Sequence, residues 1–391
     1  MITTPTKVIK ELQIEITNYC QARCPECARE QVHLSKFKKP TSPYYYELNT
    51  KYVTIEQFKS WFNKDNWEKL YLIDFCGNYD EPTTNPDLLE IIDWILGSDL
   101  FSKELVVSIA TNGGTRSTQF WKDMGSLCEK YRRNSIHSRL RVVWGIDGLE
   151  DTNHIYRINV KWNKLQENFR AFLSSGGYGY WQFIYFKHNE HQEKEVEQRS
   201  IDEGFAGMKW RGGQAHEYSK TEIRPMDIGK FKGKGKVDLT HLKNVVDLGI
   251  IDRNVIIDSL EGSGNDKWVV RDAFKNKVEN KISCKAMLGY EDKEQFSRLY
   301  VTYHGWVIPC CWWGTQLELN NVYNNYSKDT ESHKLNGKNS VQEILDTPWF
   351  TNLHEYIQTQ EPFTCVSHCK ENVYSKISTR LNTQQLVGKT S

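Results

Sequence analysis

The chain has 391 residues, 38% of them hydrophobic and 26% charged, which is the composition of an ordinary globular protein. Its length suffices for one large domain and a smaller appended one. Because 51 Lys and Arg nearly balance 50 Asp and Glu, the net charge of +1 excludes a general attraction to nucleic acid or anionic membranes. The opening segment has no apolar signal core, and no later run approaches the roughly 20 apolar residues of a membrane span. The sequence therefore predicts a cytoplasmic protein without membrane or nucleic-acid partners.

Apolar periodicity predicts that strands and helices alternate over the first 211 residues. The first strand is expected at 12–16, and a helix with Ile55, Phe58 and Phe62 on one face follows it. Strands separated by helices indicate parallel βα units, which right-handed crossovers close into either a partial barrel or a doubly wound sheet. The further strands are expected at 70–75, 105–111, 141–146, 180–186 and 206–211, and the further helices at 86–97, 118–132, 162–174 and 189–203.

Unusual polar segments follow these strands directly. They are the loop with the first three cysteines, GNYDEP (77–82), TNGG (111–114), GIDG (145–148) and KHNEH (187–191). Barrel folds place their sites at this carboxyl-terminal rim, which favours a partial (β/α)6 TIM-like barrel. We predict an α/β fold with this barrel over 1–212, a polar bridging segment over 213–282 and a small α+β domain over 283–391.

Ten cysteines in a reducing compartment favour metal ligation over disulfides. Cys20, Cys24 and Cys27 have the spacing C-x3-C-x2-C within one loop, NYCQARCPECAR. Three thiolates on a tight loop can hold three irons of a four-iron cluster and leave the fourth iron open to a chelating ligand. The alternative is a structural zinc site with a distant fourth ligand.

The cysteine motif, placed after a first strand, resembles that of the radical S-adenosylmethionine (SAM) superfamily, and the resemblance covers nearly the whole chain. In that family the open iron binds the amino and carboxylate groups of SAM. One electron from the cluster then cleaves SAM to methionine and a 5′-deoxyadenosyl radical, which abstracts hydrogen from a substrate. The resemblance implies SAM, a SAM-binding [4Fe-4S] cluster and a one-electron reductant such as flavodoxin or ferredoxin.

By the same resemblance, Glu81 or Asp80 would bind the SAM amino group, Asp147 and Arg157 would reach the SAM carboxylate, and Asn189 would pack on the adenine. The end of the third strand would face the ribose hydroxyls. Without the cysteine motif, GNYDEP and TNGG are typical of an acidic turn and a tight turn. The residues expected to bind SAM are Gly77, Asn78, Asp80, Glu81, Thr111, Asn112, Asp147, Arg157 and Asn189.

Five cysteines follow residue 280. Cys284, Cys310, Cys365 and Cys369 resemble the ligands of the auxiliary-cluster half-domain called twitch, a shortened SPASM domain. A SPASM domain holds two clusters and would need about eight ligands, so the resemblance implies one auxiliary [4Fe-4S] cluster. Cys311 either substitutes for Cys310 or is a spare thiol, which makes it a candidate hydrogen donor. A zinc ribbon is the alternative here.

The sequence therefore predicts a radical SAM oxidoreductase whose auxiliary cluster accepts an electron in a net oxidation. No catalytic residue is assigned. The short segment before the first strand has no room for a leader-peptide-binding module, so the expected substrate is a small molecule such as a sugar, cyclitol or nucleoside derivative. A peptide-modifying maturase or epimerase is the alternative within this class, and a zinc-stabilised binding protein without catalysis is the alternative outside it.

Overall fold

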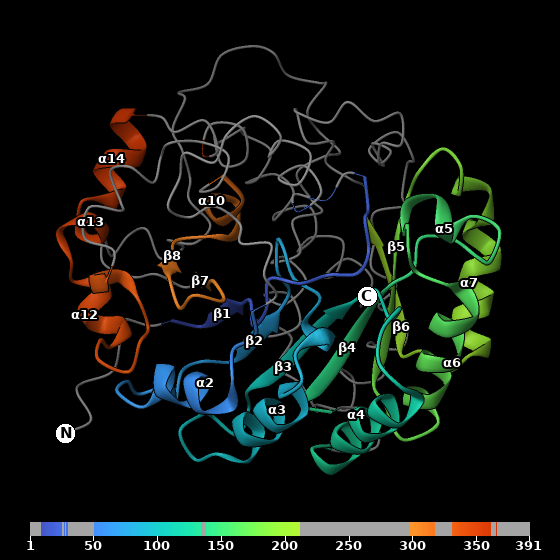
Figure 1. Cartoon of the computed structure of the whole chain (residues 1–391), viewed down its shortest axis with the longest axis horizontal. Coiled ribbons are helices and arrows are strands. Elements are labelled where there is room, and N and C mark those ends of the chain that lie inside the picture. Colours follow the sequence, from blue (N-terminus) through green and yellow to red (C-terminus); the bar gives the residue numbers. More distant parts are fainter. Residues whose placement is uncertain are drawn as a thin grey trace, which may run out of the picture.

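The computed structural model describes residues 9–25, 27, 29, 51–133, 138–211, 298–316, 331–360 and 365. They form an eight-stranded sheet of order β6-β5-β4-β3-β2-β1-β7-β8 (Figure 1). All neighbouring strands pair in parallel except β7 and β8. The strands are β1 (Glu11–Ile14), β2 (Leu72–Phe75), β3 (Val106–Thr111), β4 (Leu140–Gly145), β5 (Gly179–Ile184), β6 (Gly207–Arg211), β7 (Arg298–Val301) and β8 (Val307–Ile308). The predicted α/β fold with a central parallel sheet is confirmed, and the ends of β1 to β6 lie within two residues of the predicted ones.

Helices connect the parallel strands and pack side by side on the outer face of the curved sheet, as contacts of α3 with α2 and α4, and of α4 with α6, show (Figure 1). Two of them begin at side-chain caps, where Thr54 accepts from the Gln57 amide at 3.2 Å and Ser117 from the Phe120 amide at 3.3 Å. The helices are α2 (Ile55–Phe62), α3 (Leu88–Gly97), α4 (Thr118–Lys130), α5 (Asn153–Tyr156), α6 (Trp162–Leu173) and α7 (Glu193–Asp202), with short 3-10 turns at Pro82–Thr84 and Glu190–Gln192.

The two faces of the sheet differ in polarity, because successive side chains of a strand point to opposite sides. Leu12 and Ile14 of β1 are buried in the apolar core, while Gln13 between them is only partly buried. Residues paired in register share a face, so the polar face can be followed from strand to strand. One such row consists of Tyr300, Gln13, Asp74, Ser108 and Arg141. The inner face of the sheet is therefore polar and charged.

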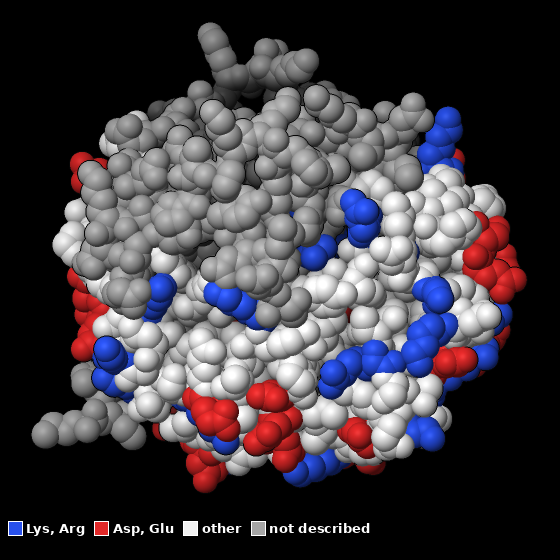
Figure 2. Space-filling model, viewed as in Figure 1, with Lys and Arg blue, Asp and Glu red and all other residues white. Residues whose placement is uncertain are grey.

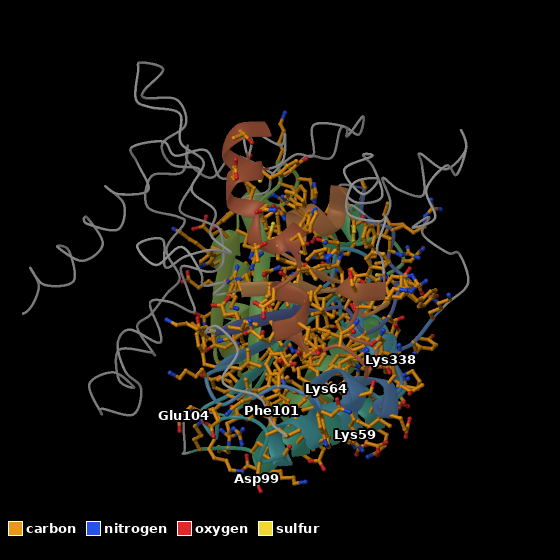
Figure 3. The ribbon with its side chains drawn as sticks, turned by 90° about the vertical axis from the view of Figure 1, so that its left-hand side faces the viewer. Lys59, Lys64, Asp99, Phe101, Glu104 and Lys338 are labelled. Atoms are coloured by element: carbon orange, nitrogen blue, oxygen red, sulfur yellow. The ribbon has the colours of Figure 1, made fainter. Side chains whose placement is uncertain are left out.

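The C-terminal part of the chain joins the same sheet, since β7 pairs with β1. Asp65 accepts hydrogen bonds from the first two amides of helix α12 (Val341–Leu345), and the bond from the Val341 amide is 2.8 Å long. Lys64 Nζ donates to the Lys338 carbonyl at 2.6 Å, and Figure 3 labels both residues. The bridge predicted at 213–282 lies outside the described residues. The C-terminal helices are α10 (Cys311–Gln316), α12 (Val341–Leu345), α13 (Pro348–Thr351) and α14 (Leu353–Gln360), with a 3-10 turn at Glu331–His333.

The exterior shows no sign of a membrane segment within the part of the chain that is described. None of its helices has the length and apolar character that crossing a bilayer requires. Acidic and basic side chains are intermixed over the described part of the face in Figure 2, in keeping with the small net charge.

Candidate functional site

The three clustered cysteines lie in the loop that follows the carboxyl end of β1. The Cys27 amide donates to the Cys24 carbonyl at 3.0 Å, a tight turn that holds two of the thiols near each other. Burial raises the pKa of the Cys24 thiol to about 12, and burial together with Glu81 and the other two thiols raises that of Cys20. Three neighbouring thiolates are stable only with compensating positive charge, which bound metal supplies.

Two kinds of metal centre could use the thiols of this loop. Among the described residues, no three His, Cys, Asp or Glu side chains are placed to hold one metal ion. A zinc ion needs all four ligands within about 2.0–2.3 Å of one point. In a four-iron cluster each thiolate binds a different iron, so the thiols stand further apart. Cys20, Cys24 and Cys27 lie on one loop and could each hold a different iron of such a cluster, whereas a zinc site would need a fourth ligand from another segment.

The GNYDEP loop after β2 contains Glu81, whose side chain is buried. Its Oε1 accepts hydrogen bonds from the hydroxyls of Thr83 at 2.6 Å and Thr111 at 2.7 Å, and its Oε2 accepts from the Asn112 amide at 2.7 Å. Burial raises the Glu81 pKa despite these bonds. The carboxylate thus connects the loop to the end of β3. Both of its oxygens already accept hydrogen bonds within the protein, so the predicted contact with the SAM amino group would add to these bonds.

Glu15, the residue directly after β1, was missed by sequence reasoning and also shapes this loop. Its Oε1 accepts from the amides of Asn78 at 2.6 Å and Tyr79 at 2.8 Å, and burial raises its pKa to about 7. Asp80 lies beside it, and burial and the charge of Glu15 raise the Asp80 pKa. A Cβ on Gly77 would lie 1.9 Å from Asp80 Oδ1, so a larger residue there would displace the Asp80 carboxylate. In the sequence, Glu11, Gln13 and Glu15 alternate with apolar residues, and this alternation could have placed Glu15 on the inner face of the sheet.

Asn112 joins the end of β3 to the cysteine loop. Its Nδ2 donates to Cys20 Sγ at 3.5 Å, and its Oδ1 accepts from Gln21 Nε2 at 2.5 Å. The neighbouring Thr111 hydroxyl donates to Glu81 and accepts from the Gly113 amide at 2.9 Å. Of the two residues predicted to face the ribose, Asn112 therefore contacts the cysteine loop, and Thr111 lies beside it against Glu81.

Arg157 lies at the same site and is not a surface cation. Its Nε donates to Asp147 Oδ2 at 2.6 Å, and one of its terminal nitrogens lies 3.9 Å from Cys24 Sγ. Burial alone would lower the Arg157 pKa, but Asp147 and Cys24 hold it above its usual value. A Cβ on Gly145 would lie 2.6 Å from the guanidinium, so glycine leaves room for it. The predicted pair of Asp147 and Arg157 thus faces the second cysteine.

Asn189 holds the loop after β5 in place. Its Oδ1 accepts from the Phe186 amide at 2.7 Å, and its Nδ2 donates to the carbonyls of Asp147 at 2.8 Å and Ile184 at 2.9 Å. The adjacent His188 ring stacks on Phe186, with centroids 5.1 Å apart. The Asn189 amide is therefore engaged within the protein, and its predicted contact with adenine would use the face of the amide.

The C-terminal cysteines are described in part. Cys310 and Cys311 lie at the start of α10. Cys365 is buried, and its sulfur accepts from Trp313 Nε1 at 3.4 Å. Cys284 and Cys369 lie outside the described residues, so the auxiliary cluster stays a prediction. Asn78 Nδ2 donates to the Cys311 carbonyl at 2.8 Å, which connects the GNYDEP loop to this region.

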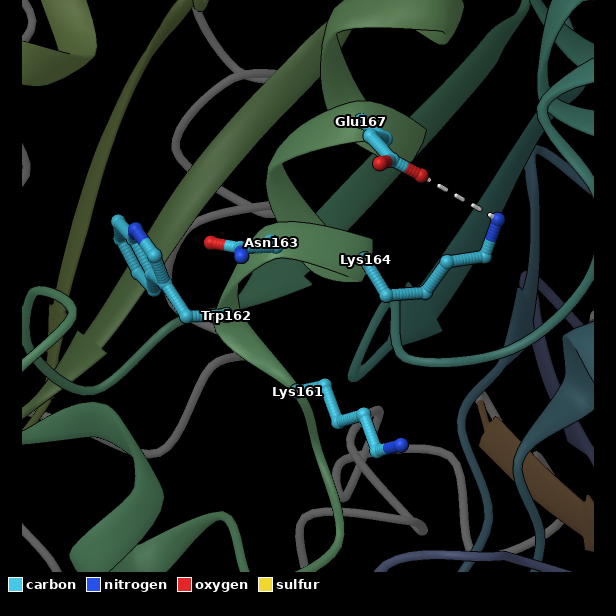
Figure 4. A pocket seen from close by; sticks show the side chains of 5 residues that line it. All are labelled: Lys161, Trp162, Asn163, Lys164 and Glu167. Carbon is cyan, nitrogen blue, oxygen red and sulfur yellow. Dashed lines mark ion pairs between the residues drawn. The ribbon is translucent and has the colours of Figure 1, made fainter.

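A shallow pocket on the outer surface lies at the start of α6 (Figure 4). Its lining includes Lys161 and Trp162, and Lys164 Nζ lies 3.8 Å from Glu167 Oε2. No residue predicted to bind SAM or metal lines it. It lacks the chemistry of the loop site and is not the candidate site.

Neither a protein-family profile nor a curated protein sequence matches the chain. Among solved structures, Streptococcus suis SuiB has a TM-score of 0.53 and 12% sequence identity, with 92% of this chain and 71% of that chain covered. SuiB bound to S-adenosylmethionine has a TM-score of 0.51 and 13% identity, with 90% and 68% covered. At this identity the likeness shows a shared architecture, and we conclude that the chain has the fold of SuiB, a protein that binds SAM.

Proposed function

We propose that the chain is a radical SAM enzyme that takes hydrogen from a substrate. The observation that carries this proposal is the meeting of the C-x3-C-x2-C loop with Asn112 and Arg157 at the carboxyl edge of a parallel sheet. A cluster bound by Cys20, Cys24 and Cys27 would supply the electron that cleaves SAM to methionine and the 5′-deoxyadenosyl radical. The SAM-bound structure of SuiB, which has this fold, supports the proposal.

The residues around the cysteines have distinct roles in this proposal. Arg157, oriented by Asp147, would bind the SAM carboxylate beside Cys24, because a guanidinium can bind a carboxylate with two hydrogen bonds. Thr111 and Asn112 would lie at the ribose. Glu15, through the Asn78 and Tyr79 amides, would hold the loop that approaches the SAM amino group.

Arg157→Lys is expected to weaken SAM binding by about tenfold or more, because lysine keeps the charge but loses the two-point contact. Equilibrium dialysis of anaerobically prepared protein measures the affinity, and iron analysis shows that the cluster is retained. Arg199→Lys is the matched control, because Arg199 lies on α7 and also pairs with a carboxylate, that of Glu203. This variant should bind SAM normally. Normal SAM affinity of the Arg157 variant would remove this residue from the proposed site.

For the second part of the chain, the proposal assigns one auxiliary cluster to Cys284, Cys365, Cys369 and either Cys310 or Cys311. A fully ligated cluster has no open iron for the substrate, so electron acceptance in a net oxidation suits it. The substrate class of the proposal is a small molecule, and a peptide is the alternative. Flavodoxin or ferredoxin would deliver the first electron.

Metal analysis tests the proposal as a whole. Protein purified and reconstituted without oxygen is expected to contain about eight irons with matching acid-labile sulfide, four for each cluster. With SAM and a strong reductant it should form 5′-deoxyadenosine. Zinc without sulfide, and no 5′-deoxyadenosine, would instead establish the zinc-stabilised binding protein.

A further inference from the structure

Three basic residues lie together on the inner face of the sheet, on β4 and β6. Arg141 lies between the core residues Leu140 and Val142, and Lys209 lies between Met208 and Trp210, so both basic side chains point away from the helices. Arg211 is two residues after Lys209 and shares its face. In register, Lys209 pairs with Gln182 of the intervening β5, and Arg211 pairs with Ile184.

Within the described residues, none of these three cations forms an ion pair with an acidic side chain. The Nε atoms of Arg141 and Arg211 are buried and donate no hydrogen bond there. Other enclosed arginines of the chain are satisfied: Arg139 donates to three backbone carbonyls, and Arg298 pairs with Glu11. A buried N–H group without an acceptor costs free energy. The two Nε groups therefore point to a ligand that supplies the acceptor.

The cations also repel one another. Burial, followed by the charges of Arg141 and Arg211, lowers the pKa of Lys209 to about 7, and Asp74 and Cys76 oppose this only in part. The Lys209 ammonium lies 5.4 Å from the centre of the Tyr180 ring. An anion placed among the three side chains would relieve their repulsion.

The cluster faces the candidate SAM site. The charge of Arg211 acts on Asp147, the partner of Arg157, and on Cys76 at the end of β2. A group held by the three cations would therefore lie on the inner side of the sheet, near the pair of Asp147 and Arg157. We propose, on the basis of the proposed function, that Arg141, Lys209 and Arg211 bind an anionic group of the substrate, either a carboxylate or a tetrahedral anion such as a phosphate ester.

Binding of two simple anions to the full-length reconstituted protein tests this inference. Sulfate stands for tetrahedral anions and acetate for carboxylates, and neither titrates between pH 6 and 9. Equilibrium dialysis with labelled anion at low chloride is expected to show one bound anion per chain. The tighter of the two identifies the substrate group. Binding of neither anion would overturn the inference.

Variants of the cluster make the test specific. Arg141→Gln and Arg211→Gln are each expected to weaken binding by about tenfold or more, because each removes a charge-assisted hydrogen bond. Lys122→Gln, an exposed lysine of α4, is the matched control and should bind the anion as the wild type does. Asp74→Asn should bind it more tightly, since an opposing carboxylate is removed, and a misfolded variant could not show such a gain. If both arginine variants bound the anion with unchanged affinity, the anion would bind elsewhere and the inference would be wrong.

The pH dependence gives an independent measurement. Lys209 is charged below its pKa of about 7, and bound anion favours the charged form, so affinity should fall as the pH rises from 7 to 9. The surrounding groups are the two arginines, Asp74, and the Cys76 thiol and Tyr180 phenol, whose pKa values burial raises. Lys209→Gln should remove this fall, and a fall that persists in it contradicts the assigned role of Lys209.

The test of the anion site can fail or succeed independently of the test of the proposed function. Formation of 5′-deoxyadenosine from SAM reports the radical chemistry and needs no substrate, whereas the dialysis reports the anion site alone. Protein that cleaves SAM but binds neither anion would overturn the inference and leave the function standing. Protein that binds the anion at these residues but does not cleave SAM would do the reverse.

Discussion

Replacing Cys20, Cys24 and Cys27 together by alanine is expected to abolish formation of 5′-deoxyadenosine from SAM and to remove about four irons per chain. The three thiols lie in one loop after β1, so the triple replacement removes every proposed protein ligand of this cluster together. The auxiliary cluster should remain, because its predicted ligands belong to another part of the chain. Iron and sulfide analysis, together with chromatography of the SAM products, measures both effects.

Cys128→Ala is the control for this experiment. Cys128 is a buried cysteine of α4, its pKa is raised by burial, and it belongs to neither predicted ligand set. The variant should retain the full iron content and normal SAM cleavage. If the triple variant still made 5′-deoxyadenosine, the assignment of the SAM-binding cluster to these cysteines would be wrong.

The second large effect is expected from Cys369→Ser, which should uncouple SAM cleavage from product formation. With the auxiliary cluster damaged and the first one intact, the enzyme should still move deuterium from labelled substrate into 5′-deoxyadenosine. It should fail to form oxidised product, because the substrate radical then has no electron acceptor. The product formed per 5′-deoxyadenosine is the deciding ratio, since loss of a cluster that cross-links the chain also lowers stability and total activity.

A wild-type ratio in the Cys369 variant would assign the auxiliary cluster a structural role and contradict the oxidative proposal. Cys311 provides the comparison. Its backbone carbonyl accepts from Asn78, and its thiol lies close enough to Cys76 to raise the pKa of that residue. If Cys311 donates hydrogen to the substrate radical, Cys311→Ala should stop turnover with both clusters intact, and the reaction would be an epimerisation.

The strand order from β1 to β6 and the loops that carry the site were predictable from sequence because they depend on local patterns. Apolar periodicity of two or about 3.6 residues locates strands and helices, and parallel βα units bring the carboxyl ends of the strands to one edge. The C-x3-C-x2-C motif is likewise local, since its three thiols lie within eight residues. Asn112 and Arg157 were expected near the cysteines because their segments resemble those that bind SAM in the radical SAM superfamily.

Contacts between distant segments were decided only by the tertiary structure. The insertion of β7 beside β1 joins residues 287 apart in sequence, such as Glu11 and Arg298, and no local pattern specifies that pairing. The hydrogen bonds of Glu81 with the end of β3 depend in the same way on how the loops meet. The cation cluster depends on strand register, because a slip of one residue would turn Lys209 from the inner face to the core. The sequence by itself determined the fold class and the cysteine loop, and tertiary packing decided which charges the protein satisfies and which it leaves for a ligand.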